Sequence, residues 1–312
     1  MKQIYDVIVV GGGPAGIMSA MAAGELGVST LLIEKNGFLG GAATASVLGP
    51  ISPFHYKDEQ VIDGLPQRFV DRMVEENGST GHMKTLDQYG SGDSLGFYDR
   101  EKYKYVAAEM LCERGVDILY HCMLESVDCF QNRVTGITVI SKGGDKIHFN
   151  AHVVVDATGD GDVAVRAGEN YVLGDERTHK MSPSSAMFEM ANVDTEKVFR
   201  YIQENPDDFE FLSDIVPLRD FSPRLKQHYF VGQGFKKLVK QAVEAGDLEF
   251  GRDSVIVLNG IHPNSMHFNA TRICGLDATD VCQRTLSEID GRRQIDSVSE
   301  LSLIHISEPT RH

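Results

Sequence analysis

The chain is poor in basic residues and has no long apolar run. Lys and Arg total 30 against 45 Asp and Glu, which gives a formal net charge of -15 over 312 residues. This sign argues against nucleic acid or an anionic membrane surface as the main partner, because both carry negative charge themselves. No apolar stretch is long enough to span a bilayer, and the segment from Met1 to Tyr5 leaves no room for a signal peptide before the first predicted strand. We therefore expect a cytoplasmic location and neither nucleic acid nor a membrane as a partner.

Cysteine is also scarce. The five cysteines are Cys112, Cys122, Cys129, Cys274 and Cys282, and no two of them form C-x-x-C. An odd number of cysteines in a chain expected in the cytoplasm argues against a disulfide framework. An iron–sulfur cluster needs four thiolates, usually with short spacings among them, and these gaps supply none. We interpret the five as buried or incidental thiols.

A glycine-rich loop follows the first apolar strand. Gly11, Gly13 and Gly16 fit G-x-G-x-x-G between a strand and a helical pattern. In this context Gly11 allows the tight turn, Gly13 lets the backbone approach a pyrophosphate, and Gly16 lets the helix lie close to the strand. The free N–H groups at the start of the helix, which follow Pro14, would then hold the phosphates. A glycine turn without a ligand is the alternative.

An acidic residue ends the second predicted strand. Glu34 lies 18 residues after Gly16, close to the roughly 20 residues expected for a ribose-binding acid. Its carboxylate would accept hydrogen bonds from ribose hydroxyls and repel a 2′-phosphate, which disfavours NADP. The loop that follows contains Gly40, Gly41 and Ala42 and has almost no bulky side chains. Backbone that must lie against a flat cofactor needs such residues, although an ordinary glycine loop would have the same composition.

A third signal follows the apolar run Val153 to Val155, in the sequence from Asp156 to Asp162. A Cβ at Gly159 would push a cofactor away, so glycine there suits a close backbone approach. Asp160 and Asp162 could cap the next helix, reach the pyrophosphate through water, or hold a cation. A cap combined with a water-mediated contact is the interpretation we favour.

These segments, over roughly residues 4 to 300, resemble the FAD-dependent oxidoreductase family within the two-dinucleotide-binding-domain flavoproteins. The resemblance implies that the first glycines hold the FAD pyrophosphate, that the acid holds the adenosine ribose, and that the second glycine pair lies by the pyrophosphate and the ribityl chain. It also places backbone around Met123 and Leu124 against the adenine. The implied cofactor residues are Gly11, Gly13, Pro14, Ala15, Gly16, Glu34, Lys35, Gly40, Gly41, Ala42, Met123, Leu124, Ala157, Thr158, Gly159 and Asp160.

The fold that this resemblance implies is α/β. It combines a Rossmann-like FAD-binding parallel sheet, an antiparallel β insert, and a second α+β domain that serves as a cap or substrate domain. We expect Gly90 to Asp93 to form a mobile loop. The predicted domain ranges are 1–50 and 97–173 for the FAD-binding domain, 51–96 for an irregular insertion, 174–300 for the cap or substrate domain, and 301–312 for a non-native tail.

The expected activity is transfer of a hydride or electron pair between a small-molecule substrate and non-covalent FAD, through flavin N5. His55 is a candidate proton donor or acceptor, and Arg272 is a candidate for holding a substrate carboxylate with its guanidinium fork. The competing interpretations are a hydrogen-bonded loop histidine and an ordinary ion pair, respectively. No residue of the second half carries a self-sufficient catalytic pattern.

Two alternatives to a self-contained enzyme follow from the resemblance. Related proteins similar to the flavin-binding component of heterodisulfide reductase pass electrons to iron–sulfur partners, so a 4Fe-4S cluster and an electron-transfer partner are implied by family alone, without a ligand motif here. Residues 301–312 resemble the translation of a sequencing adapter, and no third flavin-contacting segment ending in Gly-Asp is found. A truncated gene model, and an inactive fragment of marginal stability, is the other alternative.

Overall fold

The computed structural model describes residues 1–57, 59–85, 94–217, 228–246, 248 and 251–305. The chain divides into two compact units, with 1–46, 62–78 and 100–171 in unit 1 and the rest in unit 2. The segment 51–96, expected as one irregular insertion, is therefore shared between the units. The expected mobile loop from Gly90 to Asp93 and residues 306–312 of the expected tail lie outside the described residues.

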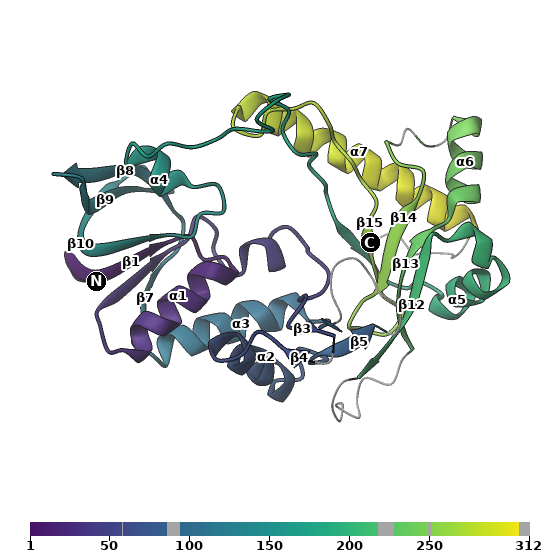
Figure 1. The fold of residues 1–312 in the computed structure, drawn as a ribbon, viewed down its shortest axis with the longest axis horizontal. Helices are drawn as coiled ribbons and strands as arrows, with labels where there is room; N and C mark the ends of the chain where they lie inside the picture. The colour runs from purple at the N-terminus through teal and green to yellow at the C-terminus, as the bar shows by residue number, and fades with distance from the viewer. Residues whose placement is uncertain (58, 86–93, 218–227, 247, 249–250, 306–312) are drawn as a thin grey trace. The chain divides into compact units, whose positions relative to one another are not determined.

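Unit 1 contains a six-stranded sheet in the order β7-β2-β1-β10-β9-β8 (Figure 1). The first four strands in this order are parallel, and β9 and β8 continue the sheet with antiparallel pairing, β9 to β10 and β8 to β9. The sheet is therefore a parallel nucleotide-binding type of sheet continued by an antiparallel extension, as expected. Its strands are β1 (Ile4–Val10), β2 (Thr30–Ile33), β7 (Asp117–Leu119), β8 (Cys122–Phe130), β9 (Arg133–Ser141) and β10 (Lys146–Asp156).

The long strand β10 joins the two parts of this sheet. The sequence suggested an antiparallel insert and a separate apolar strand at Val153 to Val155, but a single strand belongs to both. Its first half pairs antiparallel with β9, where Phe149 lies opposite Ile137, and its second half pairs parallel with β1, where Val155 lies opposite Val9. The carboxyl end of β10 therefore lies next to the carboxyl end of β1, where the glycine loop begins.

Three helices complete unit 1: α1 (Pro14–Glu25), α2 (Leu65–Glu75) and α3 (Arg100–Cys112). Small residues allow α1 to pack closely, and a Cβ at Gly24 would lie 2.9 Å from the Cβ of Arg114 just beyond α3. The carboxylate of Glu25 pairs with Arg68 on α2 at 2.9 Å and with Arg114 at 2.9 Å. Apolar packing and this ion-pair cluster together hold the three helices.

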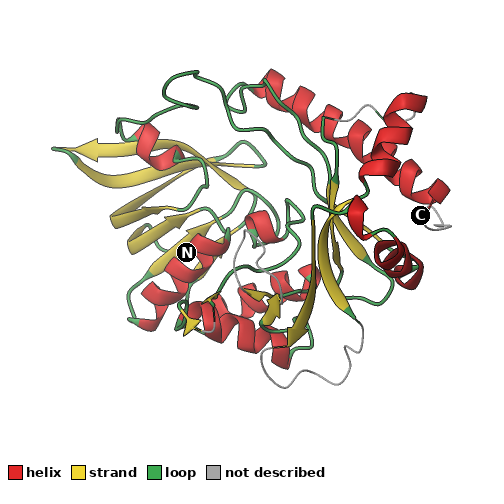
Figure 2. Cartoon of the chain, turned by 45° about the vertical axis from the view of Figure 1, so that its right-hand side comes forward, coloured by secondary structure: helices red, strands yellow, loops and turns green. Residues whose placement is uncertain are grey.

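Unit 2 is built around a seven-stranded antiparallel sheet in the order β11-β15-β14-β13-β12-β5-β6. Alternate residues of its strands enter two cores: Phe230 and Val257 pack with the helices, whereas Tyr229 and Leu258 pack on the opposite face. Figure 2 shows the sheet with helices beside it. The strands are β5 (Met83–Thr85), β6 (Ser94–Leu95), β11 (Phe188–Met190), β12 (Phe211–Pro217), β13 (Tyr229–Gly234), β14 (Val255–Asn259) and β15 (Met266–Asn269), with a separate hairpin of β3 (His55–Tyr56) and β4 (Glu59–Gln60).

Unit 2 contains three α-helices among the residues that the structure describes. Asp194 caps the first of them by accepting a hydrogen bond from the N–H of Lys197 at 2.9 Å. The helices are α5 (Thr195–Glu204), α6 (Lys236–Ala245) and α7 (Val281–His305).

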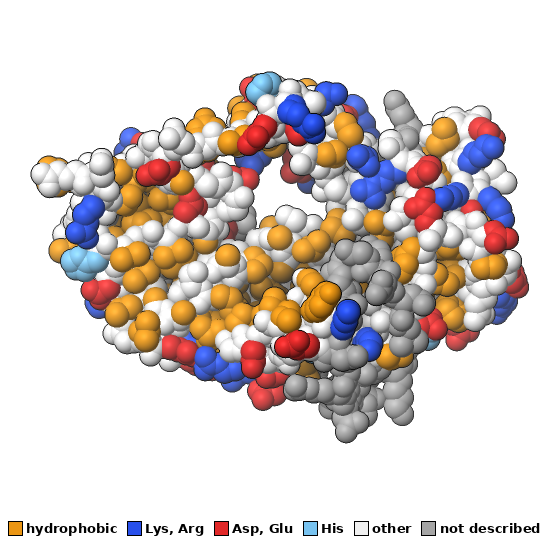
Figure 3. Space-filling model, in the orientation of Figure 1, with side chains coloured by type: hydrophobic (Ala, Val, Ile, Leu, Met, Phe, Trp, Pro, Cys, Tyr) orange, Lys and Arg blue, Asp and Glu red, His pale blue; other side chains and the backbone are white. Residues whose placement is uncertain are grey.

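The surface carries mixed charge. On the face in Figure 3, acidic and basic side chains are interspersed, with apolar side chains visible between them. Within the described residues, no helix is both long enough and apolar enough to cross a membrane.

Candidate cofactor site

Two of the three motif glycines are required by the packing of unit 1 itself. A Cβ on Gly11 would lie 2.6 Å from the carbonyl carbon of Ala157, and its φ of +106° lies in a region that side chains rarely adopt. A Cβ on Gly16 would lie 3.0 Å from the carbonyl carbon of Gly11. Glycine at these two positions lets β1, α1 and the end of β10 approach one another, whether or not a ligand is bound.

Gly13 is different, because nothing in the described protein requires glycine there. Its backbone angles, φ −73° and ψ −178°, are open to any residue. A Cβ built on it meets no described atom within 4 Å. The missing side chain therefore leaves open space beside the start of α1, which suits a ligand that contacts the backbone.

The N-terminus of α1 is suited to an anion. Gly13 is its N-cap residue and supplies no side chain, and the first turn contains no acidic residue. Pro14 and Ala15 are exposed at the first two helical positions. The first N–H groups of a helix lack intrahelical partners and lie at the positive end of its dipole, so they favour phosphate.

Glu34 is buried and already holds two loops. Its carboxylate accepts hydrogen bonds from the N–H of Gly12 at 2.8 Å and from the N–H of Asn36 at 2.7 Å, and the residue is 5% exposed. An ionised carboxylate has about four lone-pair positions, so two remain for ribose hydroxyls. The sequence pattern indicated a ribose ligand but not this internal role. Lys35, the next residue, is exposed.

The second glycine loop lies directly against the first. The N–H of Gly40 donates to the carbonyl of Gly12 at 2.8 Å, and a Cβ on Gly41 would lie 2.9 Å from the Cα of Gly13. Ala42 is exposed, in the short 3-10 helix η1 (Gly41–Ala43). The two loops therefore form one continuous backbone surface with few side chains.

The segment expected at the adenine begins beside Glu34. The N–H of Cys122, at the start of β8, donates to the carbonyl of Glu34 at 3.1 Å. Met123 is 58% exposed, and Leu124 packs partly against the unit 1 core. An exposed apolar side chain close to Glu34 is suited to contact with a flat aromatic ring.

The loop after β10 is held by a residue that the sequence analysis did not select. The carboxylate of Asp156 accepts hydrogen bonds from the N–H and the hydroxyl of Thr158, at 3.1 and 2.7 Å, and from the N–H groups of Val163 and Ala164, at 2.9 and 3.0 Å. Burial raises the pKa of Asp156, but these hydrogen bonds outweigh it and hold the pKa below its usual range. The N–H and the hydroxyl of Thr158 thus both donate their hydrogen bonds within the protein.

The prediction that Asp160 or Asp162 caps the following helix is wrong. The N-cap position of α4 (Asp162–Arg166) is Gly161, which has no side chain, and Asp156 accepts from the N–H groups of its first turn instead. Asp162 lies inside the helix and pairs with Arg166 at 2.8 Å. The reason is that the turn after β10 places the side chain of Asp156, at the end of the strand, beside the first N–H groups of the helix.

The predicted cofactor residues therefore all lie in unit 1. Hydrogen bonds and close packing join the Gly11–Gly16 loop, Glu34, the second glycine loop and Ala157, although they are far apart in the sequence. The donor set fits the pyrophosphate and ribose of FAD: free N–H groups, side-chain-free backbone and one carboxylate.

The two catalytic candidates lie in unit 2, and no described contact joins them. His55 Nδ1 lies 3.1 Å from the hydroxyl of Ser94, and its ring lies 5.2 Å from that of His82. Arg272 is exposed, and its backbone is bound to the side-chain amide of Gln294. Its guanidinium forms no ion pair among the described residues, so the ion-pair interpretation has no support within the described part of the chain.

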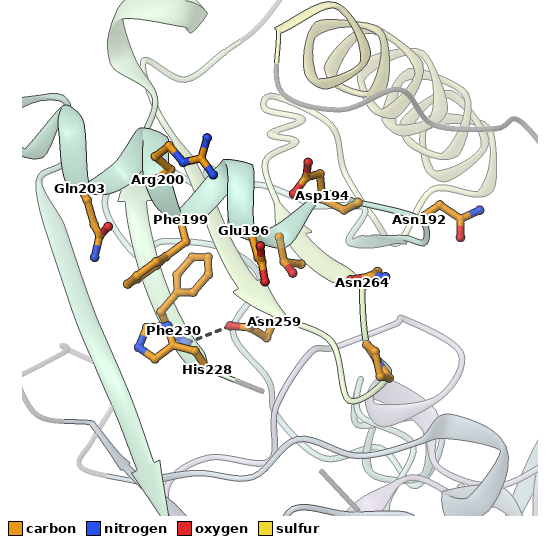
Figure 4. A pocket seen from close by; sticks show the side chains of 13 residues that line it. Asn192, Asp194, Glu196, Phe199, Arg200, Gln203, His228, Phe230, Asn259 and Asn264 are labelled. Carbon is orange, nitrogen blue, oxygen red and sulfur yellow. Dashed lines mark hydrogen bonds between the residues drawn. The ribbon is translucent and has the colours of Figure 1, made fainter. Parts of the chain in front are cut away.

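Unit 2 also contains a hollow of about 900 Å³ between α5 and the turn from β14 to β15 (Figure 4). Phe199 lies edge-on to His228 with ring centroids 4.3 Å apart, and Asn259 accepts a hydrogen bond from the N–H of Phe230 at 2.8 Å. Most polar groups around it are exposed, including Glu196 and Arg200. Sequence reasoning missed this hollow because its walls come from four separate segments.

No group of three or more His, Cys, Asp or Glu side chains is placed to hold a metal ion among the residues that the structure describes.

Comparison with known proteins gives consistent results. The family model described as FAD dependent oxidoreductase matches residues 6–308. The chain is 28% identical over 222 residues to a digeranylgeranylglycerophospholipid reductase of Methanoculleus marisnigri, covering 70% of this chain and 52% of that protein. It is 30% identical over 174 residues to a thiamine thiazole synthase of Aeropyrum pernix, and this match covers 52% of this chain and 57% of that protein. The chain thus spans little more than half the length of these relatives.

Among solved structures, the glycerol-3-phosphate dehydrogenase of Bacillus halodurans, complexed with FAD, matches with a TM-score of 0.50 at 14% identity and covers 88% of this chain and 48% of that one. At this identity the likeness concerns the fold. Because the family model matches almost the whole sequence, the chain belongs to the FAD dependent oxidoreductase family.

Proposed function

We propose that unit 1 binds FAD non-covalently and that the protein transfers a hydride or electron pair between this FAD and a small-molecule substrate. The observation that carries the proposal is Gly13: its backbone conformation is ordinary and its Cβ position is open, yet the residue is glycine at the start of an uncapped helix. A bound pyrophosphate accounts for that choice, because it needs the space that a side chain would fill.

The rest of the cofactor follows from the contacts around this point. The N-terminal N–H groups of α1 and the backbone of Gly40 and Gly41 would hold the pyrophosphate, Glu34 would accept from the adenosine ribose, and Met123 would contact the adenine. FAD supplies the redox chemistry through its flavin ring. The chain's own residues bind and orient it and keep bulky side chains away from its phosphates.

The substrate would be a small molecule handled by residues of unit 2. The guanidinium of Arg272, which has no ion-pair partner within the described residues, supports a role in holding a carboxylate, because a guanidinium fork binds one bidentately. His55, whose Nδ1 lies 3.1 Å from the hydroxyl of Ser94, would donate or accept a proton. Both roles are proposals from residue chemistry.

The test begins with cofactor binding. Purified protein is denatured and the released flavin identified, and stripped protein is titrated with FAD and, separately, with FMN, which lacks the adenosine half. We expect FAD to bind at least about tenfold more tightly than FMN, since Glu34 and Met123 would contact only FAD; tenfold corresponds to about 1.4 kcal/mol. Equal affinity for FMN, or no binding of either flavin, would contradict the proposal.

The second step tests the chemistry. Protein loaded with FAD is mixed anaerobically with a panel of small carboxylates, alcohols and amines, and bleaching of the flavin absorbance is followed. Bleaching with one member, reversed by an electron-accepting dye, supports a self-contained oxidoreductase. Flavin that binds but responds only to a protein electron donor would instead favour the electron-transfer role.

A further inference from the structure

Asp156 is the residue through which the end of β10 holds the loop that follows it. Its two carboxylate oxygens accept four hydrogen bonds, two from Thr158 on one side and one each from Val163 and Ala164 on the other. The Thr158 hydroxyl in turn accepts a hydrogen bond from the N–H of Asp162 at 3.0 Å. One carboxylate therefore fixes both ends of the Ala157–Gly161 turn.

This turn is in direct contact with the first glycine loop. The N–H of Ala157 donates to the carbonyl of Val10 at 2.9 Å, and a Cβ on Gly16 would lie 3.2 Å from the Cβ of Ala157. Gly11 has room only for hydrogen beside the Ala157 carbonyl. A shift of the turn would therefore displace Ala157 against the loop that begins at Gly11.

We propose that Asp156 is a positioning residue for FAD: without touching the cofactor, it fixes the Ala157–Gly161 turn so that the backbone surface formed with Gly11–Gly16 keeps the shape that FAD requires. This inference rests on the FAD binding by unit 1 proposed above. It assigns a role to a residue outside the predicted cofactor set.

The sign of the effect separates this role from simple electrostatics. FAD is an anion at its pyrophosphate, so a nearby carboxylate that acted only through its charge would weaken binding, and neutralising it would tighten binding. A carboxylate that acts by holding the turn gives the opposite result, because its neutralisation releases the turn. Charge-assisted hydrogen bonds of this kind are about twice as strong as neutral ones.

The experiment compares Asp156→Asn with Asp128→Asn. The first variant keeps the shape of the side chain, but its amide nitrogen cannot accept hydrogen bonds, so two of the four donors lose their acceptor. The second variant removes one negative charge from an exposed pair with His148 elsewhere in unit 1. Each stripped protein is titrated with FAD by flavin fluorescence, and the unfolding midpoint without FAD is recorded in parallel.

We expect Asp156→Asn to raise the FAD Kd by about tenfold or more, and Asp128→Asn to change it by less than about twofold. An unchanged or lower Kd for Asp156→Asn, with wild type binding FAD normally, overturns the inference and leaves the proposed function intact. Absence of FAD binding by the wild type would instead be a failure of the proposed function.

A second pair of variants covers the case in which Asp156→Asn does not fold. Thr158→Val removes the hydroxyl that donates to Asp156, whereas Thr158→Ser keeps it. We expect Thr158→Val to weaken FAD binding more than Thr158→Ser does, because the serine hydroxyl can still bond to Asp156 and to the N–H of Asp162. Equal Kd values for these two variants would overturn the inference.

Discussion

Substituting Ala at Gly13 and at Gly11 should separate the requirements of the ligand from those of the fold. At Gly13 the added methyl meets open space and an ordinary backbone conformation. Reduced freedom of the unfolded chain favours Ala by about 0.4–1 kcal/mol, and the poorer N-cap preference of Ala offsets this by a similar amount. The stability of Gly13→Ala without FAD should therefore stay within about 1 kcal/mol of wild type.

At Gly11 the same methyl would lie 2.6 Å from the carbonyl carbon of Ala157, at a φ of +106°. A left-handed conformation costs a side chain about 1–2 kcal/mol, and forcing an extra methyl into packed structure costs about 1–3 kcal/mol. Gly11→Ala should therefore lose about 2–5 kcal/mol of unfolding free energy even when no cofactor is present.

FAD affinity should respond differently from stability. The Gly13 methyl occupies space that we assign to the pyrophosphate, so Gly13→Ala should raise the FAD Kd at least about tenfold, a loss of about 1.4 kcal/mol. Urea denaturation of the stripped proteins and FAD titration give the two quantities independently. The reasoning is refuted if Gly13→Ala binds FAD like wild type, or if it is destabilised as strongly as Gly11→Ala.

Three further predictions concern single side chains. Because the pKa of Asp156 is lowered in the folded state, the stability that its carboxylate contributes is complete above the ordinary carboxyl value of about 3.9 and is lost as the pH falls below it. The urea midpoints of wild type and Asp156→Asn should therefore differ by a constant amount down to about pH 5 and converge below about pH 4. Equal midpoints at neutral pH would contradict this prediction. Arg272→Ala should change the unfolding free energy by less than about 0.5 kcal/mol, because the guanidinium has no ion-pair partner within the described chain; a loss above about 1 kcal/mol, measured by urea denaturation, would restore the ion-pair interpretation. Glu34→Gln places an amide nitrogen against the N–H of Gly12 or of Asn36, so it should lower the unfolding free energy by about 1–3 kcal/mol and weaken FAD binding. If this variant has the urea midpoint and the FAD Kd of the wild type, neither hydrogen bond matters.

The parts of the fold that could be predicted from sequence are those specified locally. The strand before Gly11 and the helix from Pro14 each depend on residues a few positions apart. The family resemblance added the parallel sheet with its antiparallel insert, which is confirmed. Strands β12 and β13 were not predicted, although they pair with each other and β13 pairs with β14; only β5, the other partner of β12, comes from a distant segment.

Side-chain roles were harder to predict, because hydrogen bonds depend on how the chain curls after an element ends. Asp156 looked like the last residue of a strand, whereas Asp160 and Asp162 looked like helix caps. Only the three-dimensional path of the turn shows which carboxylate reaches the N–H groups of α4. Glu34 was selected for a ribose, but its bonds to both neighbouring loops require Gly12 and Asn36 to be placed around it.

The two units differ in how their segments are distributed along the chain. Every segment of unit 1 lies within residues 1–171, whereas unit 2 needs 47–61 and 79–99, which are embedded in that stretch, as well as everything from 172 onward. During synthesis, all of unit 1 has emerged before the larger part of unit 2 exists, so the nucleotide-binding half can mature first on the ribosome. Unit 2 has no such freedom: no contiguous fragment contains its sequence without also carrying strands and helices of its neighbour.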